Sequence, residues 1–301
     1  MGSEMCIRDR LIMGSFLGIF LVSSFIGCNT SNVDATFKVG GIPDQDSARL
    51  ARRYDSFANY LSKELGVKVE YVPSVNYSAV VNAFGKGDLD AAFFGGLTGV
   101  QARLQNPGSV AVAQRENDAK FHSKFIARKD LNLTSLEAVK SRSSELSITF
   151  GSESSTSGHL MPRKFLKGVG IEADSDFSIP SNFSGSHDLT WQLVESGSFD
   201  IGALSEAVWA RAVEEQKVDI TLVDEFYTTP DYFDYNWTIR PGLDEIYGEG
   251  FSVKFQQALL KLNGEEHQEI LELFSTDKFI STQNSNYDAI EQVARELKII
   301  Q

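Results

Sequence analysis

Cysteine and histidine are scarce in this sequence of 301 residues. There are only two cysteines, Cys6 and Cys28, and both lie in the N-terminal segment rather than in the body of the chain. A disulfide framework and a cysteine-based metal site are therefore excluded for the body. His122, His159 and His267 show no spacing typical of metal ligands, and no glycine-rich phosphate loop is present, so we expect neither a metal nor a cofactor.

Positive charge is also in short supply, with 28 Lys and Arg against 41 Asp and Glu and a formal net charge of −13. This balance argues against nucleic acid as a partner. It does not exclude an anionic ligand, because helix N-termini and hydroxyl groups set the local field of a pocket. No stretch after residue 30 approaches the apolar length of a membrane span, so we expect a soluble, monomeric body.

The N-terminal segment reads as an export signal. Two arginines precede the apolar stretch 11–26, which is short and interrupted for a membrane span, and the stretch ends at Gly27-Cys28. This ending resembles the lipobox of bacterial lipoproteins, with Phe25 where that motif usually has Leu. We therefore predict a lipoprotein signal peptide at 1–28, acylation of Cys28, and a periplasmic or cell-surface protein anchored to the membrane by lipid. An ordinary secretory signal and an uncleaved anchor are the alternatives.

Beyond the signal, short apolar strands alternate with amphipathic helices, which predicts an α/β protein. The length exceeds what one hydrophobic core usually organises, so two lobes are expected. The clearest predicted strands are 36–41, 68–72, 90–94, 147–150 and 200–203, and the clearest predicted helices are 47–65, 77–84, 158–167, 186–195, 251–262, 266–274 and 287–297.

A weak internal repeat supports two similar lobes. Gly87-Asp88-Leu89-Asp90 precedes one strand, and Gly197-Ser198-Phe199-Asp200 precedes another. The C-terminal helices are expected to pack on the first lobe, with crossings near 127–129 and 237–240 as a two-segment hinge. The predicted boundaries are 29–127 and 241–301 for lobe 1 and 128–240 for lobe 2, and we expect the lobes to close on a ligand.

The most informative segment is 150–162, in which a strand is followed by a turn rich in Ser and Thr and then by a helix. Such a turn directs backbone N–H groups, hydroxyls and the positive end of a helix dipole at one point, which favours an anion site. Simple capping of the helix by these hydroxyls is the alternative.

This turn resembles the Ser-Thr-Ser-Gly signature of the periplasmic phosphonate and phosphite binding proteins of ABC importers. Three further segments resemble that family in the same order, namely 76–81, 87–95 and 184–188, and the similarity extends over about 36–297. The resemblance implies a type II periplasmic-binding fold with two lobes. It also implies that the anion is held by Tyr77 from the first lobe and by Ser155, Thr156, Ser157 and His187 from the second.

Two departures from the family pattern bear on the ligand. Gly95 is followed by Gly96-Leu97-Thr98-Gly99 where the family often has Pro and an aromatic residue, which alters one wall of the pocket. Aminophosphonate binders place a carboxylate in the helix after the second-lobe strand, where this chain has Glu206 in an uncertain register. The segments 95–98, 158–162 and 232–237 most resemble a subgroup labelled as selenate-binding.

Several candidate residues have a structural interpretation as well as a functional one. Tyr77 fits a helix core, and His187 fits a helix cap as well as a ligand contact. A further set of residues is predicted to line the cleft, with packing at the lobe crossing as the alternative for the aromatic ones: Asp44, Phe94, Gly95, Gly96, Glu206, Tyr235 and Trp237. Arg115 is either an anion partner or a solvated charge.

The sequence therefore predicts a binding protein that works with ABC permease subunits and catalyses nothing, because no nucleophile elbow, metal cluster or cofactor fingerprint is present. Its expected ligand is a small tetrahedral oxyanion of the phosphonate, phosphite and phosphate class. Selenate is the alternative ligand, and a lipoprotein that feeds a signalling receptor is the alternative role. A free histidine titrates near ~6.5, and contact with the anion should stabilise a protonated ring, so His187 is expected to strengthen anion binding as the pH falls from about 8 to 6.

Overall fold

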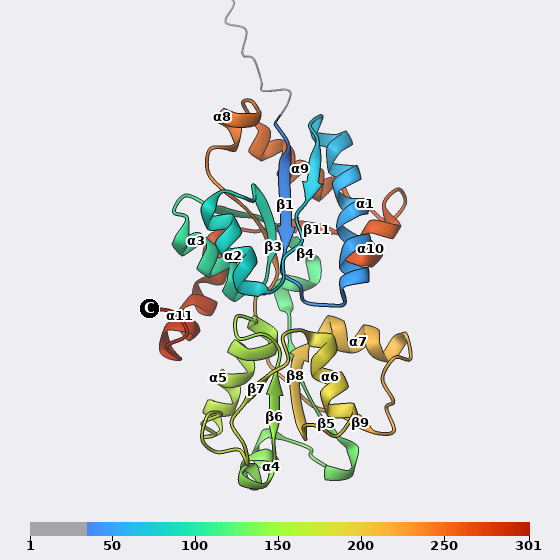
Figure 1. Cartoon of the computed structure of the whole chain (residues 1–301), viewed down its shortest axis with the longest axis vertical. Helices are drawn as coiled ribbons and strands as arrows, with labels where there is room; N and C mark the ends of the chain where they lie inside the picture. The colour runs from blue at the N-terminus through green and yellow to red at the C-terminus, as the bar shows by residue number, and fades with distance from the viewer. Residues whose placement is uncertain (1–34) are drawn as a thin grey trace, which may run out of the picture. The chain divides into compact units, whose positions relative to one another are not determined.

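The computed structural model describes residues 35–301. The predicted signal peptide 1–28 and the predicted lipidation site Cys28 lie outside these residues. Two separate β-sheets are each accompanied by helices, which confirms the α/β class (Figure 1). Between residues 35 and 301, no helix combines the length and the apolar character needed to cross a bilayer.

The first sheet has six strands in the order β11-β4-β10-β3-β1-β2. β1 pairs in parallel with β2 and β3, whereas β10 is antiparallel to β3 and β4, and β11 is antiparallel to β4. The strands are β1 Phe37–Gly41, β2 Val69–Tyr71, β3 Ala91–Phe94, β4 Val110–Arg115, β10 Asn236–Ile239 and β11 Phe279–Ser281. This sheet and its helices are called the first lobe below.

Helices lie on both sides of the first sheet: Figure 1 shows α2 and α3 on one side and α1 and α10 on the other. The helices of this lobe are α1 Ser47–Leu65, α2 Tyr77–Lys86, α3 Gly96–Gln105, α8 Leu243–Tyr247, α9 Phe251–Lys261, α10 Gln268–Phe274 and α11 Asp288–Glu296, with a 3₁₀ turn at Asn284–Tyr287. α1 begins where the Asp46 side chain accepts the Arg49 N–H, and it ends at Gly66 in the left-handed region. Its predicted apolar face is buried in the core.

The second sheet has five strands in the order β7-β6-β8-β5-β9. β6 pairs in parallel with β7 and β8, and β5 is antiparallel to β8 and β9. Its strands are β5 Ser123–Arg128, β6 Ile148–Phe150, β7 Asn182–Phe183, β8 Ile201–Ser205 and β9 Val223–Thr228, and its helices are α4 Leu136–Lys140, α5 Met161–Gly168, α6 His187–Glu195 and α7 Glu206–Glu214, with 3₁₀ turns at Lys129–Leu131 and Ser143–Glu145. This sheet and its helices are called the second lobe.

The two sheets share one strand order. β1 lies between β2 and β3 in the first sheet, and β6 lies between β7 and β8 in the second. β3 and β8 then each pair with a strand that arrives from the other lobe, β10 in the first sheet and β5 in the second. The repeated phrases noted in the sequence occupy equivalent places, since Asp90 comes directly before β3 and Asp200 directly before β8. The internal similarity therefore reflects a structural repeat.

The hinge crossings lie earlier in the chain than predicted. The segments that join the sheets are 116–122 and 229–235, whereas the predicted crossings, 127–129 and 237–240, overlap the ends of β5 and β10. β5 and β10 are each buried within the sheet that they enter, so their apolar residues do not differ from those of other strands and do not mark a crossing. The predicted lobe boundaries at 127/128 and 240/241 move accordingly. Phe121 and Tyr232 tie the two crossings together by exchanging backbone hydrogen bonds of 2.9 and 3.0 Å.

Candidate functional site

The hydroxyl-rich turn after β6 carries out both roles considered for it. Ser155 is a cap, because its Oγ accepts the Gly158 N–H at 2.9 Å and starts a π-helical turn, Thr156–Leu160, that continues into α5. The Thr156 and Ser157 side chains are also buried, at 2 % and 1 % exposure, but neither caps this turn. The turn thus presents two buried hydroxyls that are not needed for its own fold.

Close packing in this turn requires glycine. A Cβ added to Gly158 would lie 2.9 Å from Ser155 Oγ and 3.0 Å from His187 Cε1, and the Gly151 N–H donates to the Gly158 carbonyl at 2.9 Å. The His187 ring therefore packs directly against the turn. This contact joins the segments 150–162 and 184–188, which the sequence analysis identified separately.

Tyr77 and His187 occupy equivalent positions in the two lobes. Tyr77 is the first residue of α2, which follows β2, and His187 is the first residue of α6, which follows β7. Each comes directly after a capping residue, Asn76 or Ser186, whose side chain accepts the backbone N–H three residues further along. The Tyr77 hydroxyl is buried and has no hydrogen-bond partner within residues 35–301. Burial raises the pKa of Tyr77 well above its usual value, as do two nearby carboxylates, while the neighbouring Ser155 hydroxyl lowers it. Tyr77 is therefore a neutral phenol whose hydrogen has no acceptor among residues 35–301.

The His187 side chain is neutral, which corrects the expectation that its protonation strengthens anion binding as the pH falls from about 8 to 6. The ring is fully buried, and burial lowers its pKa to about 4. Its Nδ1 accepts the Ser205 N–H at 3.2 Å, so the hydrogen of the neutral ring is on Nε2. Nε2 lies 3.4 Å from the Tyr235 hydroxyl. The ring can therefore donate one hydrogen bond without carrying a charge.

Asp44 lies at the junction of the two lobes. The side chain is buried, with Oδ1 3.5 Å from Arg53 Nη1, and its carbonyl accepts the His187 N–H at 3.1 Å. Burial raises the pKa of Asp44, but Arg53, His187, Gln45 and Arg115 together hold it below its usual value. Asp44 is therefore an ionised carboxylate whose charge is balanced by protein groups.

Asp234 is the functional candidate that sequence reasoning left unplaced. Its Oδ1 accepts the Gly96 N–H at 2.9 Å, whereas its Oδ2 is buried and has no partner in the described part of the chain. Burial, with a smaller contribution from the nearby Asp118 carboxylate, raises the pKa of Asp234 to about 7, although hydrogen bonds from Gly96 and Thr156 and the charge of Arg115 lower it. The segment 232–237 was noted for its resemblance to a selenate-binding subgroup, but the direction of the Asp234 carboxyl cannot be inferred from the sequence.

The N-terminal turn of α3 contacts both of these elements. Leu97 donates its N–H to Thr156 Oγ1 at 2.9 Å, across the two lobes, one residue after the Gly96 bond to Asp234. A Cβ on Gly95 would lie 3.2 Å from Thr156 Oγ1, and one on Gly96 would lie 3.2 Å from the Phe233 carbonyl. Gly95 and Gly96 thus allow close approach rather than supplying a side chain to the site.

Four other predicted residues lie in different surroundings. Phe94 and Trp237 belong to the first-lobe core rather than to a cleft wall: the Trp237 ring stacks on Phe57 at 4.9 Å, because the alternation of β10 turns it towards the helices. Glu206 binds the N–H and Nδ1 of His122 at 3.0 and 2.9 Å. Tyr235 is buried beside His187, and the Arg115 guanidinium lies over the Tyr235 ring, 4.5 Å from its centroid.

Arg115 is a buried structural cation rather than a solvated charge. Its guanidinium makes hydrogen bonds of 2.8 and 2.6 Å to the two oxygens of Asp118 and a third, of 2.9 Å, to the Phe274 carbonyl. The pair lies where the first crossing leaves β4. Its charge is therefore compensated without an anion.

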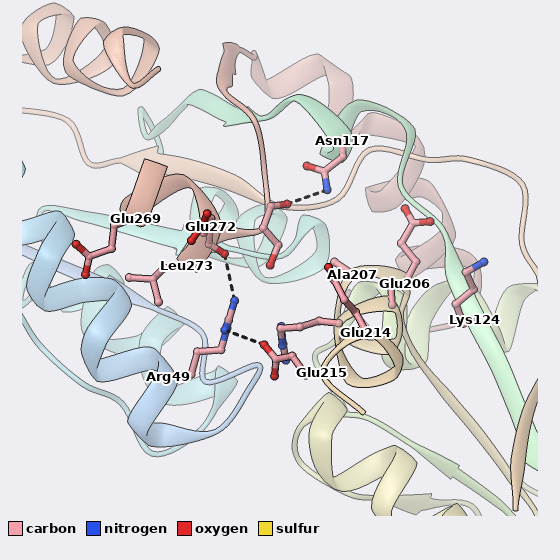
Figure 2. Close-up of a pocket in the computed structure, with 13 residues that line it drawn as sticks. Arg49, Asn117, Lys124, Glu206, Ala207, Glu214, Glu215, Glu269, Glu272 and Leu273 are labelled. Carbon is pink, nitrogen blue, oxygen red and sulfur yellow. Dashed lines mark hydrogen bonds and ion pairs between the residues drawn. The ribbon is translucent and has the colours of Figure 1, made fainter. Parts of the chain in front are cut away.

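A groove of about 900 Å³ is lined by residues of both lobes (Figure 2). Arg49 of α1 points towards Glu215, which follows α7, with 3.6 Å between Nη1 and Oε1, and donates to the Glu272 carbonyl at 3.1 Å. Glu206 lines this groove. The groove is therefore a charged seam between the lobes, distinct from the buried cluster around His187.

Within the described residues, the buried cluster offers hydrogen-bond donors from both lobes and a carboxylate oxygen without a partner. The donors are Tyr77, Thr156, Ser157, His187 and Tyr235, and the acceptor is Oδ2 of Asp234. Such a set can bind an oxyanion through donated hydrogen bonds and can accept one hydrogen from it.

Comparison with known proteins places this geometry in context. A family model described as ABC transporter, phosphonate, periplasmic substrate-binding protein matches residues 39–287. The probable ABC transporter phosphite binding protein PhnD1 of Prochlorococcus marinus is 42% identical over 267 residues, which cover 87% of this chain and 90% of that protein.

Solved structures agree with the family match. The structure of PhnD1 from Prochlorococcus marinus in complex with methylphosphonate has a TM-score of 0.85 and 41% identity, and covers 88% of this chain and 99% of that one. A binding protein component of an ABC phosphonate transporter from Pseudomonas aeruginosa has a TM-score of 0.76 at 19% identity, covers 86% of this chain and 85% of that one, and supports the fold alone. The predicted type II periplasmic-binding fold is confirmed.

Proposed function

Because the chain belongs to the periplasmic substrate-binding proteins of phosphonate ABC transporters, we propose that it captures a small tetrahedral oxyanion that retains one proton, of the phosphonate, phosphite or phosphate class. The anion is held between the lobes by Tyr77, Thr156, Ser157 and His187, with Ser155 shaping the turn. The relatives are binding components of importers, and this chain has the same role: it delivers the anion to permease subunits and does not transform it.

The observation that carries this proposal is the unpartnered Oδ2 of Asp234. A buried acceptor without a donor costs about 1–3 kcal/mol, so a ligand that supplies a hydrogen recovers that cost. Phosphite, phosphate and methylphosphonate can each retain a hydrogen on oxygen near neutral pH, whereas sulfate and selenate carry none. A protonated oxyanion therefore satisfies both the donors and the acceptor of the cluster. The relative from Prochlorococcus marinus named for phosphite, and its complex with methylphosphonate, support this class.

Calorimetry with purified protein tests the proposal against a panel of phosphite, methylphosphonate, phosphate, sulfate and selenate near pH 7.5. We expect at least one protonated oxyanion to bind tighter than selenate by a factor of 10 or more, which corresponds to about 1.4 kcal/mol. Asp234→Asn should reduce that preference, because an amide can donate to an unprotonated oxygen. If no member of the panel binds, the ligand assignment is wrong.

Selenate is the second candidate, and the pKa of Asp234 is the observation that favours it at low pH. Below about 7 the Asp234 carboxyl is protonated and becomes a donor, so the cluster then offers donors alone. Selenate keeps a constant charge around neutrality, and its affinity should fall as the pH rises through about 7. Equal affinity for selenate and phosphite at pH 8 would favour the selenate assignment.

Closure of the lobes on the anion is part of the proposed function, because the donors come from both lobes. The two crossings at 116–122 and 229–235 provide the hinge. Solution scattering with and without the bound anion should show a smaller radius of gyration in the complex. An unchanged radius at saturating ligand would mean that the site is preformed in the closed state.

We further propose that Cys28 is the acylated N-terminus of the exported protein, as the Gly27-Cys28 pair and the family's periplasmic location suggest. Cys28→Ala should release the protein from the membrane fraction, and intact-mass analysis should detect lipid on the parent alone. A parent without lipid would indicate an ordinary secretory signal. Genes for a permease and an ATPase beside this one would favour transport over delivery to a signalling receptor.

A further inference from the structure

We propose that the backbone N–H of Gly96 is a positioning group for the anion site: it holds Oδ1 of Asp234, leaves Oδ2 to accept the ligand's hydrogen, and so sets the preference for a protonated oxyanion. This inference rests on the proposed function. It assigns a specificity role to the glycine that replaces the family's frequent proline, although Gly96 has no side chain and contributes nothing to the site but its amide.

The two oxygens of Asp234 have different surroundings. Oδ1 accepts the Gly96 N–H at 2.9 Å, and Oδ2 is buried without a partner within residues 35–301. The side chain is 1 % exposed, so water does not compete for either oxygen from outside. A carboxyl with one fixed oxygen has one orientation, and Oδ2 is then presented in one direction.

The Gly96 N–H is well placed to hold Oδ1 of Asp234. Gly96 is the first residue of α3, a helix of 10 residues that has no side-chain cap of its own. The first amides of a helix have no partner within it and lie at the positive end of its dipole. Asp234, 138 positions away in sequence, takes the place of a local cap. The amide therefore favours the ionised carboxylate, which is the form that accepts a hydrogen.

The next amide fixes a donor in the same way. Leu97 donates to Thr156 Oγ1 at 2.9 Å, so the Thr156 hydroxyl is an acceptor there, and its own hydrogen is directed to the region of Asp234, where it lowers the pKa of the carboxyl. Two consecutive amides of α3 thus orient one acceptor, Asp234, and one donor, Thr156. Since Thr156 belongs to the second lobe, the second bond requires the lobes to be closed.

Other charged and titratable groups act on Asp234 as well. Asp118 and Arg115 lie close in the first crossing and at the end of β4, and the phenols of four tyrosines respond to its charge. These tyrosines are Tyr77, Tyr232, Tyr235 and Tyr287. None of these residues is itself replaced in a Gly96 variant, so a titration that changes in Gly96→Pro but not in Gly96→Ala reports on the loss of the bond between the amide and Asp234.

A matched pair of variants isolates the N–H. Gly96→Ala keeps the amide hydrogen, whereas Gly96→Pro replaces it with the ring Cδ, which occupies the path of the bond to Asp234 Oδ1 and displaces that oxygen; both variants add a Cβ at 3.2 Å from the Phe233 carbonyl. The backbone tolerates proline here, because it is favoured at the first helical position and Gly95, at φ −74° and ψ 168°, has the extended conformation that precedes it.

The experiment measures phosphite and selenate affinities of the parent and both variants by calorimetry between about pH 6 and pH 8.5. We expect Gly96→Ala to keep the phosphite-to-selenate preference and Gly96→Pro to lower it by about 10-fold, one hydrogen bond to a charged group being lost. The midpoint of the selenate profile should rise in Gly96→Pro only. Equal preferences and midpoints in the two variants would overturn the inference. A parent that binds no oxyanion would instead overturn the proposed function.

A second measurement does not depend on how the proline variant folds. In the parent, the Gly96 amide proton should shift with pH along a titration curve centred near 7, the value to which the pKa of Asp234 is raised. The same signal, assigned through Gly96→Ala, should be flat in Asp234→Asn. A Gly96 amide that does not respond to pH in the parent contradicts the proposed hydrogen bond.

Discussion

The first and second lobes repeat one strand order, yet they contribute different chemistry at equivalent positions. The first lobe has Tyr77 at the start of α2, and the second lobe has His187 at the equivalent start of α6. Both are buried donors. The phenol has no hydrogen-bond partner in the described part of the chain, whereas the ring of His187 is held by the Ser205 N–H, so the second lobe fixes its donor more firmly.

The turns after the first strands differ more strongly. In the first lobe the segment after β1 carries the ionised Asp44, and in the second the segment after β6 carries the hydroxyls of Ser155, Thr156 and Ser157. An anion is attracted by the hydroxyls and repelled by a carboxylate unless that charge is compensated, as Arg53 does here. The repeat therefore supplies a common scaffold, and the second lobe supplies most of the donors.

The sharpest test of this asymmetry compares Thr156→Val in the second lobe with Tyr77→Phe in the first. Thr156→Val removes a donor to the anion and leaves the buried Leu97 N–H without its acceptor, a combined cost of about 3 kcal/mol or about 100-fold in affinity. Tyr77→Phe removes one donor only, and about 10-fold is expected. Calorimetry with the tightest ligand of the panel measures both.

Thr156→Ser is the matched control, because it keeps the hydroxyl and loses only a methyl group. It should bind within a few-fold of the parent. If Tyr77→Phe costs more affinity than Thr156→Val, the first lobe is the principal donor and the asymmetry is reversed.

The second prediction concerns His187, whose equivalent in the first lobe cannot titrate near neutral pH. Because burial lowers the pKa of His187 to about 4, it is neutral at pH 6 to 8 and adds no inflection to the binding profile there. His187→Ala should weaken binding by about 10-fold or more through the lost Nε2–H donor. His187→Gln, whose amide nitrogen can replace Nε2, should recover part of the loss.

Any inflection that remains between pH 6 and 8 belongs to Asp234 or to the ligand, and it should persist in His187→Gln. Selenate, whose charge is constant in this range, separates the two. A selenate profile that loses its inflection in His187→Gln but keeps it in Asp234→Asn would show that the histidine is the titrating group.

The sequence predicted the repeated elements better than it predicted their connections. The apolar spacing of α1 and the cap of α2 are local signals, and both helices begin where expected. The antiparallel β5 and β10 gave no such signal, because each is defined by the sheet that it enters, far away in sequence. The hinge was misplaced for that reason.

The candidate site divides in the same way. The turn 155–157 could be recognised from its own residues, and its hydroxyls are buried as a ligand site requires. Asp234 could not be placed, because its orientation depends on an amide in α3 across 138 positions. The pKa of His187 was misjudged because a helix start reveals nothing about burial, and burial decides it.

The third prediction uses the structural repeat itself. Asp90 accepts hydrogen bonds from Lys38 N, Arg240 Nε and Tyr247 Oη, each of 2.8 Å, before β3. Asp200, before β8, accepts from Ser147 N at 2.9 Å, from Ser147 Oγ at 2.8 Å and from Arg128 Nη1 at 3.1 Å.

The two side chains differ in burial, at 6 % exposure for Asp90 and 19 % for Asp200. A more buried charge loses more when its partners are mismatched, so Asp90→Asn should lower the free energy of unfolding by about 2–3 kcal/mol and Asp200→Asn by about 1–2 kcal/mol. Urea denaturation of the two variants beside the parent measures this. A larger loss for Asp200→Asn would mean that the corner of the second lobe matters more for stability than its exposure indicates.

The smallest expected effect lies in the charged seam between the lobes, where Arg49 faces Glu215 (Figure 2). The pair spans 3.6 Å, and the two side chains are 13 % and 36 % exposed, so it is worth about 0.2–1 kcal/mol. Because it joins the lobes, it favours the closed state and hence ligand binding. Glu215→Gln should weaken the affinity by less than about 5-fold at low salt, and the difference should disappear near 1 M salt, where the Debye length is about 3 Å.

Glu172→Gln is the control, since Glu172 pairs with Lys167 within the second lobe at 3.8 Å and its loss cannot alter closure. If both variants weaken binding equally, the effect comes from the overall charge of the protein and not from the seam. If the Glu215→Gln difference persists at high salt, the contact acts by packing, and the two lobes are joined by shape rather than by charge at this edge.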